Sequence, residues 1–375
     1  MRILHLIDSG GVYGAERVLL YLAREQQRQG HEPLLGSIAR PGVGTTPLEA
    51  LAGSWGLSVL PVRVPPKATP AVVRSLLRTV REARADVLHS HGYKADILLG
   101  PMPRAWRGPM IATLHGWLWS PAFTALWLRE RLDLLSLARM DLVVAVTHAM
   151  LSVPALGRMN PAKRRVIANG IPSLKERMAD LAVDRVPALP EGCVAFMRQQ
   201  PTLVAIGRLS PEKGFDLLLR AFAQVRESGA PHYQLLIAGE GPARATLEQT
   251  IGLLGLQECV LLPGYVAGAD RLLAHAAGFV MSSFTEGMPL VLLEAMQWGV
   301  PVLATAVGAI PEILREGGGQ LVAPRDLAAL RQGLVSVLSS GAVAAPRGGV
   351  VERFGSARMA EEYQQAYLDV LSRRH

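Results

Sequence analysis

The sequence predicts an α/β protein with two Rossmann-like domains, each built on a doubly wound parallel sheet, facing each other across a cleft. Short apolar segments alternate with amphipathic ones along nearly the whole chain, a pattern that favours parallel strands joined by helical crossovers. The alternating series occurs twice, and prolines mark the stretch between the two series. A length of 375 residues fits two domains of ordinary size.

The first series begins at the amino terminus. The apolar run Ile3–Ile7 predicts a strand, and the glycine turn after it leads into a helix with Val18, Leu19 and Leu22 on one face. Further strands are expected at Pro33–Ile38, Leu57–Val62, Val87–His89, Met110–Leu114 and Leu142–Val146. Helices are expected at 47–55, 71–84 and 122–138.

The second series follows a proline-marked linker at 172–190. Its strands are expected at Leu203–Ile206, Gln234–Ala238, Val260–Leu262, Gly278–Met281 and Val302–Ala304. Its helices are expected at Phe215–Glu227, Ala243–Leu254, 269–276, 289–298 and 356–372. We therefore expect a first domain over 1–180, a second over 181–355, and a final helix at 356–375 that packs back toward the first domain. Ligands of such sheets bind at the carboxyl ends of the strands.

Composition excludes several classes of protein. Half of the residues are apolar and 19% are charged, which excludes wholesale disorder. Charges, histidines and prolines interrupt every apolar run before the roughly 18 residues of a membrane span. The apolar run at the amino terminus is too short for a signal peptide and ends at Asp8. With only Cys193 and Cys259, a reducing compartment fits better than a disulfide framework, so we expect a cytoplasmic protein.

Positive charge is concentrated in the first half of the chain. Residues 1–187 hold 24 Lys and Arg against 14 Asp and Glu, a net charge of +10, whereas residues 188–375 hold 15 against 17, a net charge of −2. A basic half suggests an anionic partner such as phosphate, nucleic acid or an acidic membrane surface. Solubility alone explains the excess equally well. No recognition motif accompanies the charge, so nucleic acid is not expected as a partner.

Two turns carry candidate phosphate-binding groups. The turn Asp8–Glu16 contains Gly10 and Gly11 before a helix, which suits an anion or simply a tight turn. The stretch Gly207–Gly214 also follows a strand, and its Arg208 and Lys213 could converge on a diphosphate. Two solvated surface cations are the alternative.

A third turn carries two glutamates. Glu286 precedes Gly287, Met288, Pro289 and Leu290, and Pro289 suits the first turn of a helix, where backbone amides remain free. Glu294 lies eight residues after Glu286, among apolar neighbours on that helix, so its carboxylate needs a partner. One glutamate could reach the sugar end of a ligand and the other its nucleoside end. A carboxylate favoured by the helix dipole is the alternative for Glu286.

The sequence offers no obvious metal clamp. It contains no Asp-x-Asp pair, so we expect no divalent cation on a diphosphate and no cofactor. His89 and His91 lie two residues apart at a strand end, where a metal, a cleft surface or hydrogen bonds are all possible roles.

Taken in order, these motifs resemble the GT-B-fold, retaining family 4 glycosyltransferases (glycosyl transferases group 1). The resemblance covers nearly the whole chain. It rests on Gly10-Gly11, Asp86–Gly92, Thr113–Trp117, Val166–Ile171, Gly207–Gly214, Ala238–Pro242, the pair Glu286 and Glu294, and Gly299–Val302. Two departures, Ala168 before Asn169-Gly170 and Ala309-Ile310 before Pro311-Glu312, concern only local loop shape.

The resemblance implies a role for each motif. Arg208 and Lys213 would hold the donor diphosphate and stabilise the leaving group, Glu294 would bind the ribose, and Glu286 would contact the sugar, with His115 beside it. Amides of Gly287 to Leu290 would face the sugar and phosphates, as would Gly207, Gly10 and Gly11. Tyr13, His91 and Trp117 would lie on the acceptor side.

The implied activity is transfer of a hexose-type sugar from a nucleoside-diphosphate-sugar to a glycan or lipid-linked acceptor in cell-surface polysaccharide biosynthesis. A non-catalytic sugar-nucleotide- or glycan-binding scaffold is the alternative. Three tryptophans within 117–127 and four arginines on the helix at 71–84 suit a membrane interface, and core packing with a solvated face suits them equally. A peripheral position at the inner face of the cytoplasmic membrane therefore stays open.

Overall fold

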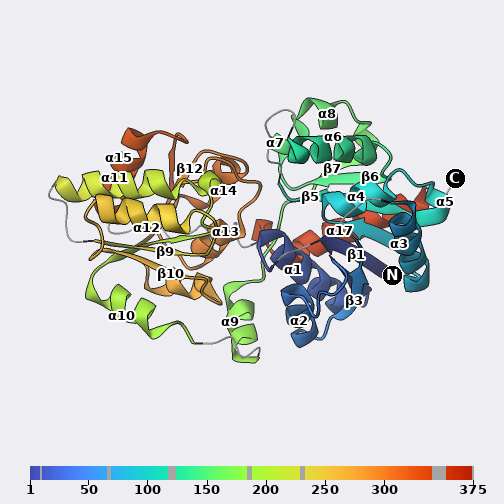
Figure 1. The fold of residues 1–375 in the computed structure, drawn as a ribbon, viewed down its shortest axis with the longest axis horizontal. Coiled ribbons are helices and arrows are strands. Elements are labelled where there is room, and N and C mark those ends of the chain that lie inside the picture. Colours follow the sequence, from blue (N-terminus) through green and yellow to red (C-terminus); the bar gives the residue numbers. More distant parts are fainter. Residues whose placement is uncertain are drawn as a thin grey trace. The chain divides into compact units, whose positions relative to one another are not determined.

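The computed structural model describes residues 1–8, 11–65, 69–116, 124–183, 188–228, 233–339 and 352–373. The chain divides into two compact units. The first combines Met1–Pro172 with Phe354–His375, and the second is Ser173–Arg353. Each unit is described by itself below (Figure 1).

The first unit contains a seven-stranded parallel sheet in the order β3-β2-β1-β4-β5-β6-β7. Its strands are β1 (Arg2–Asp8), β2 (Glu32–Ala39), β3 (Ser58–Arg63), β4 (Val87–Ser90), β5 (Met110–Leu114), β6 (Leu142–Ala145) and β7 (Arg164–Val166). Its helices are α1 (Gly14–Arg28), α2 (Pro47–Ser54), α3 (Pro70–Ala83), α4 (Tyr93–Leu99), α5 (Arg104–Arg107), α6 (Ala125–Leu137), α7 (His148–Leu151), α8 (Pro154–Gly157), the 3-10 turn η1 (Pro161–Lys163) and α17 (Ser356–Ser372).

The second unit contains a six-stranded parallel sheet in the order β10-β9-β8-β11-β12-β13. Its strands are β8 (Thr202–Ile206), β9 (Gln234–Ala238), β10 (Val260–Gly264), β11 (Gly278–Met281), β12 (Val302–Thr305) and β13 (Gln320–Val322). Its helices are α9 (Leu174–Val183), α10 (Glu191–Gln199), η2 (Pro211–Lys213), α11 (Phe215–Glu227), α12 (Arg244–Leu253), η3 (Ala269–His275), α13 (Leu290–Gln297), α14 (Ile310–Gly317) and α15 (Leu327–Ser339). Its core joins residues of the sheet to residues of α11 and α15, including Leu203, Phe222, Leu235 and Leu334.

The predicted fold class is confirmed by the two parallel sheets and their helices. Sequence reasoning missed β7 and β13, which are edge strands of three residues with one neighbour each, β6 and β12. Three residues are too few to show the periodic pattern of apolar residues that identifies a strand. The stretch read as a linker contains the helix α9, which an ion pair from Arg177 to Asp270 fastens to the second unit.

In both sheets the strand order reverses at one point, between β1 and β4 and between β8 and β11. The connections that leave these neighbouring strands run to opposite sides, so a crevice opens at their carboxyl ends. The loops after β1 and β4, and those after β8 and β11, carry most of the residues that the motifs singled out. The topology therefore positions one candidate site in each unit.

Helix α17 closes the core of the first unit, although it follows the second unit in sequence. It packs against α1, and its red ribbon lies among blue and cyan elements (Figure 1). Ser356 donates a hydrogen bond to Glu25 at 2.9 Å, and Arg165 pairs with Asp369 at 2.5 Å. Its buried side chains include Tyr363 and Tyr367.

Helix α3 buries its apolar face in the first unit. Val72, Leu76, Leu77 and Val80 are all at most 8% exposed, which leaves only the arginine side of the helix on the surface. In the part of the chain that the structure describes, every helix is too short or too polar to cross a membrane.

Helix α6 has the opposite arrangement. Its acidic Glu130 and Asp133 are buried, whereas Leu128, Leu132 and Leu135 are 54%, 41% and 69% exposed. The three leucines are four and three residues apart, so they form one stripe along the helix.

Asp133 faces a second buried carboxyl, Asp96 of α4, which accepts a hydrogen bond from Ser90. Burial raises the pKa of Asp133 to about 7. Burial, together with the charge of Asp133, raises the pKa of Asp96 well above its ordinary value. The folded unit therefore keeps protons on this pair that the unfolded chain releases.

We expect this pair to make folding depend on pH. A raised carboxyl pKa favours folding at low pH, and that contribution is lost as pH rises from about 4 to about 7. At about 1.4 kcal/mol per pKa unit, the loss at Asp133 is at most about 4 kcal/mol. Asp133→Asn should flatten the dependence, whereas Glu361→Gln, at an exposed carboxylate of α17, should leave it unchanged. Chemical denaturation between pH 4 and pH 8 measures both, and parallel curves for wild type and Asp133→Asn would contradict the assignment.

Candidate active site

In the second unit, the loops after β8 and β11 lie in close backbone contact with each other. Gly214 has a φ of +65°, and a Cβ there would lie 2.2 Å from the carbonyl oxygen of Ser282. The Ser282 hydroxyl donates to the Lys213 carbonyl at 2.9 Å, and the Phe284 amide donates to the Glu212 carbonyl at 2.7 Å. A glycine at 214 is what allows the two backbones to come this close.

This contact brings Lys213 and Glu286 together. The Lys213 ammonium lies 2.6 Å from Glu286 Oε1, and the Ser283 hydroxyl donates to the same oxygen at 2.7 Å. The two side chains are 23% and 10% exposed, so the pair borders the surface without being fully solvated. A lysine in this position can exchange a carboxylate for another anion, such as a phosphate, at little structural cost.

The turn after Glu286 is held from the loop that follows β12. The Ala309 amide donates to the Gly287 carbonyl at 2.9 Å, and a Cβ at Gly308, whose φ is +55°, would lie 2.2 Å from the Glu286 carbonyl. Helix α13 then begins without a side-chain cap at Pro289. The side chains of Met288, Pro289 and Leu290 are buried, so at this turn they can offer a ligand only their backbone.

Arg208 and Glu294 occupy contrasting environments. Arg208 is exposed, and its guanidinium forms no hydrogen bond or ion pair with the described part of the chain. Gly207 before it donates its amide to the Ala238 carbonyl. Glu294 is 1% exposed, as expected for a carboxylate among apolar neighbours on α13.

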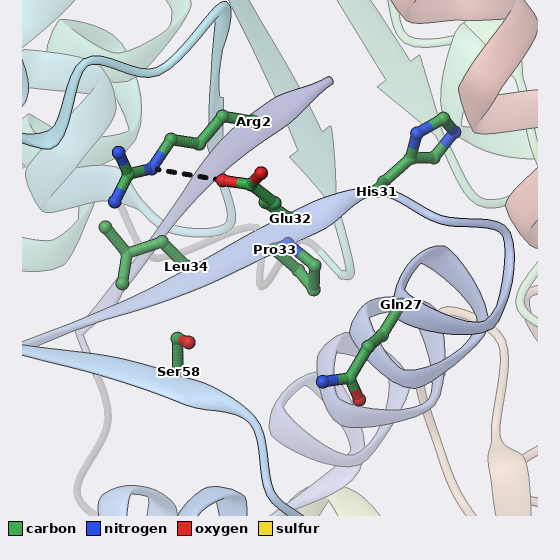
Figure 2. Close-up of a pocket in the computed structure, with 7 residues that line it drawn as sticks. All are labelled: Arg2, Gln27, His31, Glu32, Pro33, Leu34 and Ser58. Atoms are coloured by element: carbon green, nitrogen blue, oxygen red, sulfur yellow. Dashed lines mark ion pairs between the residues drawn. The ribbon is translucent and has the colours of Figure 1, made fainter.

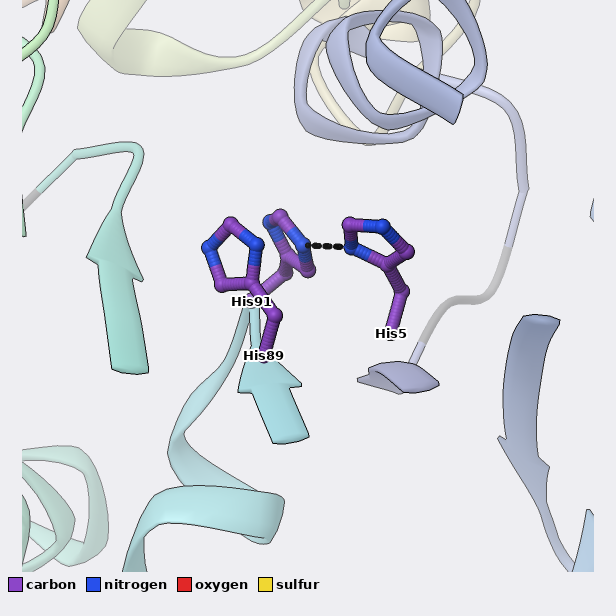
Figure 3. A group of neighbouring side chains, drawn as sticks. All are labelled: His5, His89 and His91. Atoms are coloured by element: carbon purple, nitrogen blue, oxygen red, sulfur yellow. Dashed lines mark hydrogen bonds between the residues drawn. The ribbon is translucent and has the colours of Figure 1, made fainter. Parts of the chain in front are cut away.

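In the first unit, four histidines gather below the carboxyl ends of β1, β4 and β5. His5 of β1 is the register partner of His89 on β4. His5 Nδ1 lies 3.0 Å from His91 Nε2 (Figure 3), and His91 Nδ1 lies 3.0 Å from His115 Nε2. Thus His115, next to the end of β5, is the outermost member of a line of three rings.

The line continues inward through Gln26 to α17. Gln26 Oε1 lies 2.8 Å from His5 Nε2, and Gln26 Nε2 donates to the Tyr367 hydroxyl at 3.0 Å. The same hydroxyl lies 2.8 Å from His89 Nδ1, whose other nitrogen contacts Thr113. Thr113 in turn lies 2.8 Å from the Tyr363 hydroxyl. We call these eight side chains the histidine network; its members are His115, His91, His5, Gln26, Tyr367, His89, Thr113 and Tyr363.

The histidine network is electrically neutral at physiological pH. Burial lowers the pKa of His5 and of His115 to about 4. Burial and the neighbouring rings lower the pKa of His89 and of His91 well below the ordinary value. Each ring therefore carries a single N–H.

The ring nitrogens of His5, His89 and His91 come close enough together to suggest a metal site. Both nitrogens of each ring already have a hydrogen-bond partner within the histidine network. A metal would have to displace several of these bonds, so the donor set fits a hydrogen-bonded core better than a metal centre.

Of the remaining predicted residues of the first unit, the structure describes Tyr13, Gly11 and His91. Tyr13 is 55% exposed before α1, and its ring covers Gly11, where a Cβ would lie 2.8 Å away. Gly10 and Trp117 lie outside the described residues. His91 is 6% exposed with both ring nitrogens engaged, so it supports His115 rather than offering its ring to an acceptor.

Sequence reasoning missed the inner members of this network. His5, Gln26, Tyr363 and Tyr367 carry no motif, and a polar residue every few positions in an apolar segment was the only available signal. Figure 2 shows a separate pocket at the amino ends of β1, β2 and β3. The candidate site is at the carboxyl ends of the strands, so this pocket lies at the opposite edge of the sheet. It is lined by Arg2, Gln27, His31, Glu32, Pro33, Leu34 and Ser58.

Two family models match the chain in the order of its two sheets. Glycosyltransferase Family 4 matches residues 12–173, and Glycosyl transferases group 1 matches residues 200–340. The chain thus carries one domain of each family, and it is a glycosyltransferase. The resemblance first read from the motifs is thereby confirmed.

Individual glycosyltransferases support this membership. The chain is 26% identical over 323 residues to N-acetyl-alpha-D-glucosaminyl L-malate synthase of Bacillus anthracis, covering 80% of this chain and 79% of that protein. It is 34% identical over 160 residues to the GDP-mannose-dependent alpha-(1-6)-phosphatidylinositol monomannoside mannosyltransferase of Mycolicibacterium smegmatis, covering 40% and 41%.

Solved structures share the fold of this glycosyltransferase. HepE of Anabaena in complex with UDP-glucose superimposes with a TM-score of 0.75 at 22% identity, over 98% of this chain and 99% of that one. The two-sheet α/β architecture is therefore the GT-B fold.

We expect Gly214 to be indispensable for the interlocked loops of this glycosyltransferase. Gly214→Ala adds a Cβ against backbone at a left-handed φ, whereas Gly255→Ala adds one at a φ of +63° with no atom within 4 Å. The conformational cost alone is about 1–2 kcal/mol, and displacing Ser282 should add at least about 1 kcal/mol. Urea denaturation of the two variants measures the difference. Equal losses of stability would contradict the close approach.

Proposed function

We propose that this glycosyltransferase moves a hexose-type sugar, with retention of anomeric configuration, from a nucleoside-diphosphate-sugar to a glycan or lipid-linked acceptor in cell-surface polysaccharide biosynthesis. One observation carries the donor side of the proposal. Lys213 and Glu286, 73 residues apart, meet at 2.6 Å beside the point where the second sheet reverses its strand order. A cation and a carboxylate at that edge suit the diphosphate and the sugar of one ligand.

In this proposal the donor diphosphate replaces Glu286 as the partner of Lys213. The exposed guanidinium of Arg208 supplies a second cation from the same turn. Cleavage of the bond between the sugar and the phosphate increases negative charge on the leaving group, and preorganised cations aimed at that charge lower the barrier. The leaving phosphate would itself help to deprotonate the acceptor on the same face of the sugar.

The remaining groups bind the rest of the donor. Glu286, released from Lys213, contacts sugar hydroxyls, and Glu294 hydrogen-bonds the ribose. Amides of Gly287 to Leu290 face the sugar and phosphates at the uncapped start of α13, where the helix dipole favours an anion. The resemblance further implies phosphate contacts for Gly207, Gly10 and Gly11, and contact with the sugar for His115. No metal is required, because cations and a helix terminus balance the diphosphate charge.

Proteins similar to this chain use different donor nucleotides. HepE was solved with UDP-glucose and the mycobacterial relative is named for GDP-mannose, so both nucleotides are candidates for this chain. The name of the mycobacterial relative also gives a phosphatidylinositol mannoside as acceptor, which supports a lipid-linked acceptor here.

We infer that a lipid-linked acceptor is reached from an anionic membrane surface through α6. Its exposed stripe of Leu128, Leu132 and Leu135 has no covering segment among the described residues. The exposed Arg129 and Arg131 lie beside it. Leucines flanked by arginines match the acyl and headgroup layers of such a surface. Helix α3 contributes charge only, because its apolar face is buried.

A non-catalytic scaffold that binds a sugar-nucleotide or glycan is the alternative function. It requires nucleotide binding without turnover. Slow hydrolysis of UDP-glucose or GDP-mannose in the absence of acceptor would exclude the scaffold.

We expect UDP or GDP to stabilise the folded protein. At one hundred times Kd, a nucleotide adds about 2.7 kcal/mol to the free energy of unfolding. Arg208→Ala should remove most of this stabilisation, whereas Arg198→Ala, at an exposed arginine of α10, should leave it intact. Thermal unfolding with UDP, GDP, ADP and dTDP measures the effect. Unchanged melting of the wild type with all four would refute the donor site.

Arg208 and Lys213 are also expected to act on the chemical step. Arg208→Ala and Lys213→Ala should each lower kcat at least about tenfold, a cautious value beside the usual 10²–10³ for one preorganised donor. The double variant should lose less than the product of the two, because both cations serve one diphosphate. Steady-state kinetics with the donor identified by thermal unfolding measures this. A near-wild-type kcat in one variant would mean that its residue is only a solvated surface cation.

Membrane binding is expected to depend on the α6 stripe. Burial of one leucine in a membrane is worth about 1.5–3 kcal/mol, so Leu135→Ser should weaken binding to phosphatidylglycerol vesicles at least about tenfold. Leu253→Ser, at a leucine 80% exposed on α12, is the matched control and should bind as wild type does. Vesicle sedimentation at two salt concentrations measures both. Equal binding by the two variants would exclude α6 as the contact.

A further inference from the structure

We propose that the histidine network fixes one tautomer of His115, with hydrogen on Nε2 and a bare lone pair on Nδ1, and that His115 therefore accepts a hydrogen bond from a hydroxyl group of the ligand. Gln26 and Tyr367 act as positioning residues in this arrangement. The inference deepens the proposed function, since it rests on that function to bring a ligand to His115.

The first step is that every ring holds one hydrogen. The network lies in the interior of the first unit, where His5 and His89 are 0% exposed. Burial disfavours the charged imidazolium. A neutral imidazole has one donor nitrogen and one acceptor nitrogen, so a partner that defines one nitrogen also defines the other.

The second step follows the hydrogens outward from Gln26. Its Oε1 can only accept, so His5 Nε2 donates to it and His5 Nδ1 is left as an acceptor. His91 Nε2 must then donate to His5, which leaves His91 Nδ1 as an acceptor. His115 Nε2 donates to it in turn, and His115 Nδ1 keeps its lone pair. No described residue hydrogen-bonds that atom.

The third step identifies what holds Gln26. Turning its amide end over would reverse every hydrogen bond between His5 and His115 and would put the hydrogen on His115 Nδ1. In the orientation that the structure has, Gln26 Nε2 donates to the Tyr367 oxygen, and this contact keeps the amide in place. The Tyr367 hydroxyl then has its own hydrogen for His89 Nδ1, which lies 2.8 Å away. Gln26 and Tyr367 are 1% and 0% exposed, so water cannot replace either contact.

The fourth step concerns ligand chemistry. A neutral Nδ1 with a lone pair attracts a hydroxyl, which has a hydrogen to give. It repels an ionised phosphate oxygen, which has none. The network therefore suits His115 to a hydroxyl of the sugar or of the acceptor and not to the diphosphate. The opposite tautomer would suit the diphosphate.

The test compares two tyrosines on one helix. Tyr367→Phe removes the hydroxyl that orients Gln26, whereas Tyr363→Phe removes one beyond Thr113, at the far end of the network. Both side chains are fully buried on α17, so the two changes are matched in chemistry and environment. Gln26→Leu is a second variant that acts at the amide itself.

The readout is long-range ¹H–¹⁵N spectroscopy of the whole chain labelled with ¹⁵N-histidine, with His115 assigned from the spectrum of His115→Gln. We expect Nε2–H in the wild type and in Tyr363→Phe, and a mixture of both tautomers in Tyr367→Phe and Gln26→Leu. Hydrolysis of UDP-glucose should lose kcat about tenfold in the latter two, as expected for a misplaced group, with little change in KM.

Several results would overturn the inference. These are Nδ1–H on His115 in the wild type, an equal change of tautomer in Tyr363→Phe, or a stoichiometric metal bound to His5, His89 and His91 in the purified protein. If His115 has the expected tautomer but UDP-glucose neither binds nor turns over, the network is supported and the proposed function is what fails.

Discussion

The candidate donor site depends on the contact between the loops after β8 and β11. Because Gly214 has no side chain, the Lys213 backbone can lie against Ser282, and the side chains of Lys213 and Glu286 then meet without a long reach. The loop after β12 adds the support of Gly308 and Ala309 beneath the next turn. Three loops thus form one edge, whose geometry is set by backbone contacts and not by the charged groups that it presents.

The two units differ in the contacts that fill the edge where each sheet reverses its strand order. Both sheets reverse their order between the first and fourth strands of the unit, so both offer a crevice at that edge. In the second unit, the described residues at this edge are joined by backbone contacts and by the ion pair of Lys213 and Glu286. The first unit fills it with neutral polar side chains, whose hydrogen bonds are directional and lie inside a low-dielectric core.

The sequence predicted the fold class and most strands because parallel strands buried on both faces read as apolar runs. It also predicted Lys213 and Glu286 one by one, but their ion pair depends on a loop contact that no local pattern encodes. His5 was missed for a related reason, since its partner His89 is set by the register of β1 against β4. Periodicity located α6 as a helix, yet the inward direction of Asp133 follows from packing against α4.

The discontinuity of the first unit has a consequence for biosynthesis. Its sheet is complete by Pro172, but the tyrosines that complete its core arrive with α17, after all of Ser173–Arg353 has been made. Domains generally fold as they emerge from the ribosome. The second unit can therefore fold while Gln26 and His89 of the first still lack their partner Tyr367. Contacts so distant along the chain form slowly, which makes docking of α17 the expected last step in maturation of the first unit.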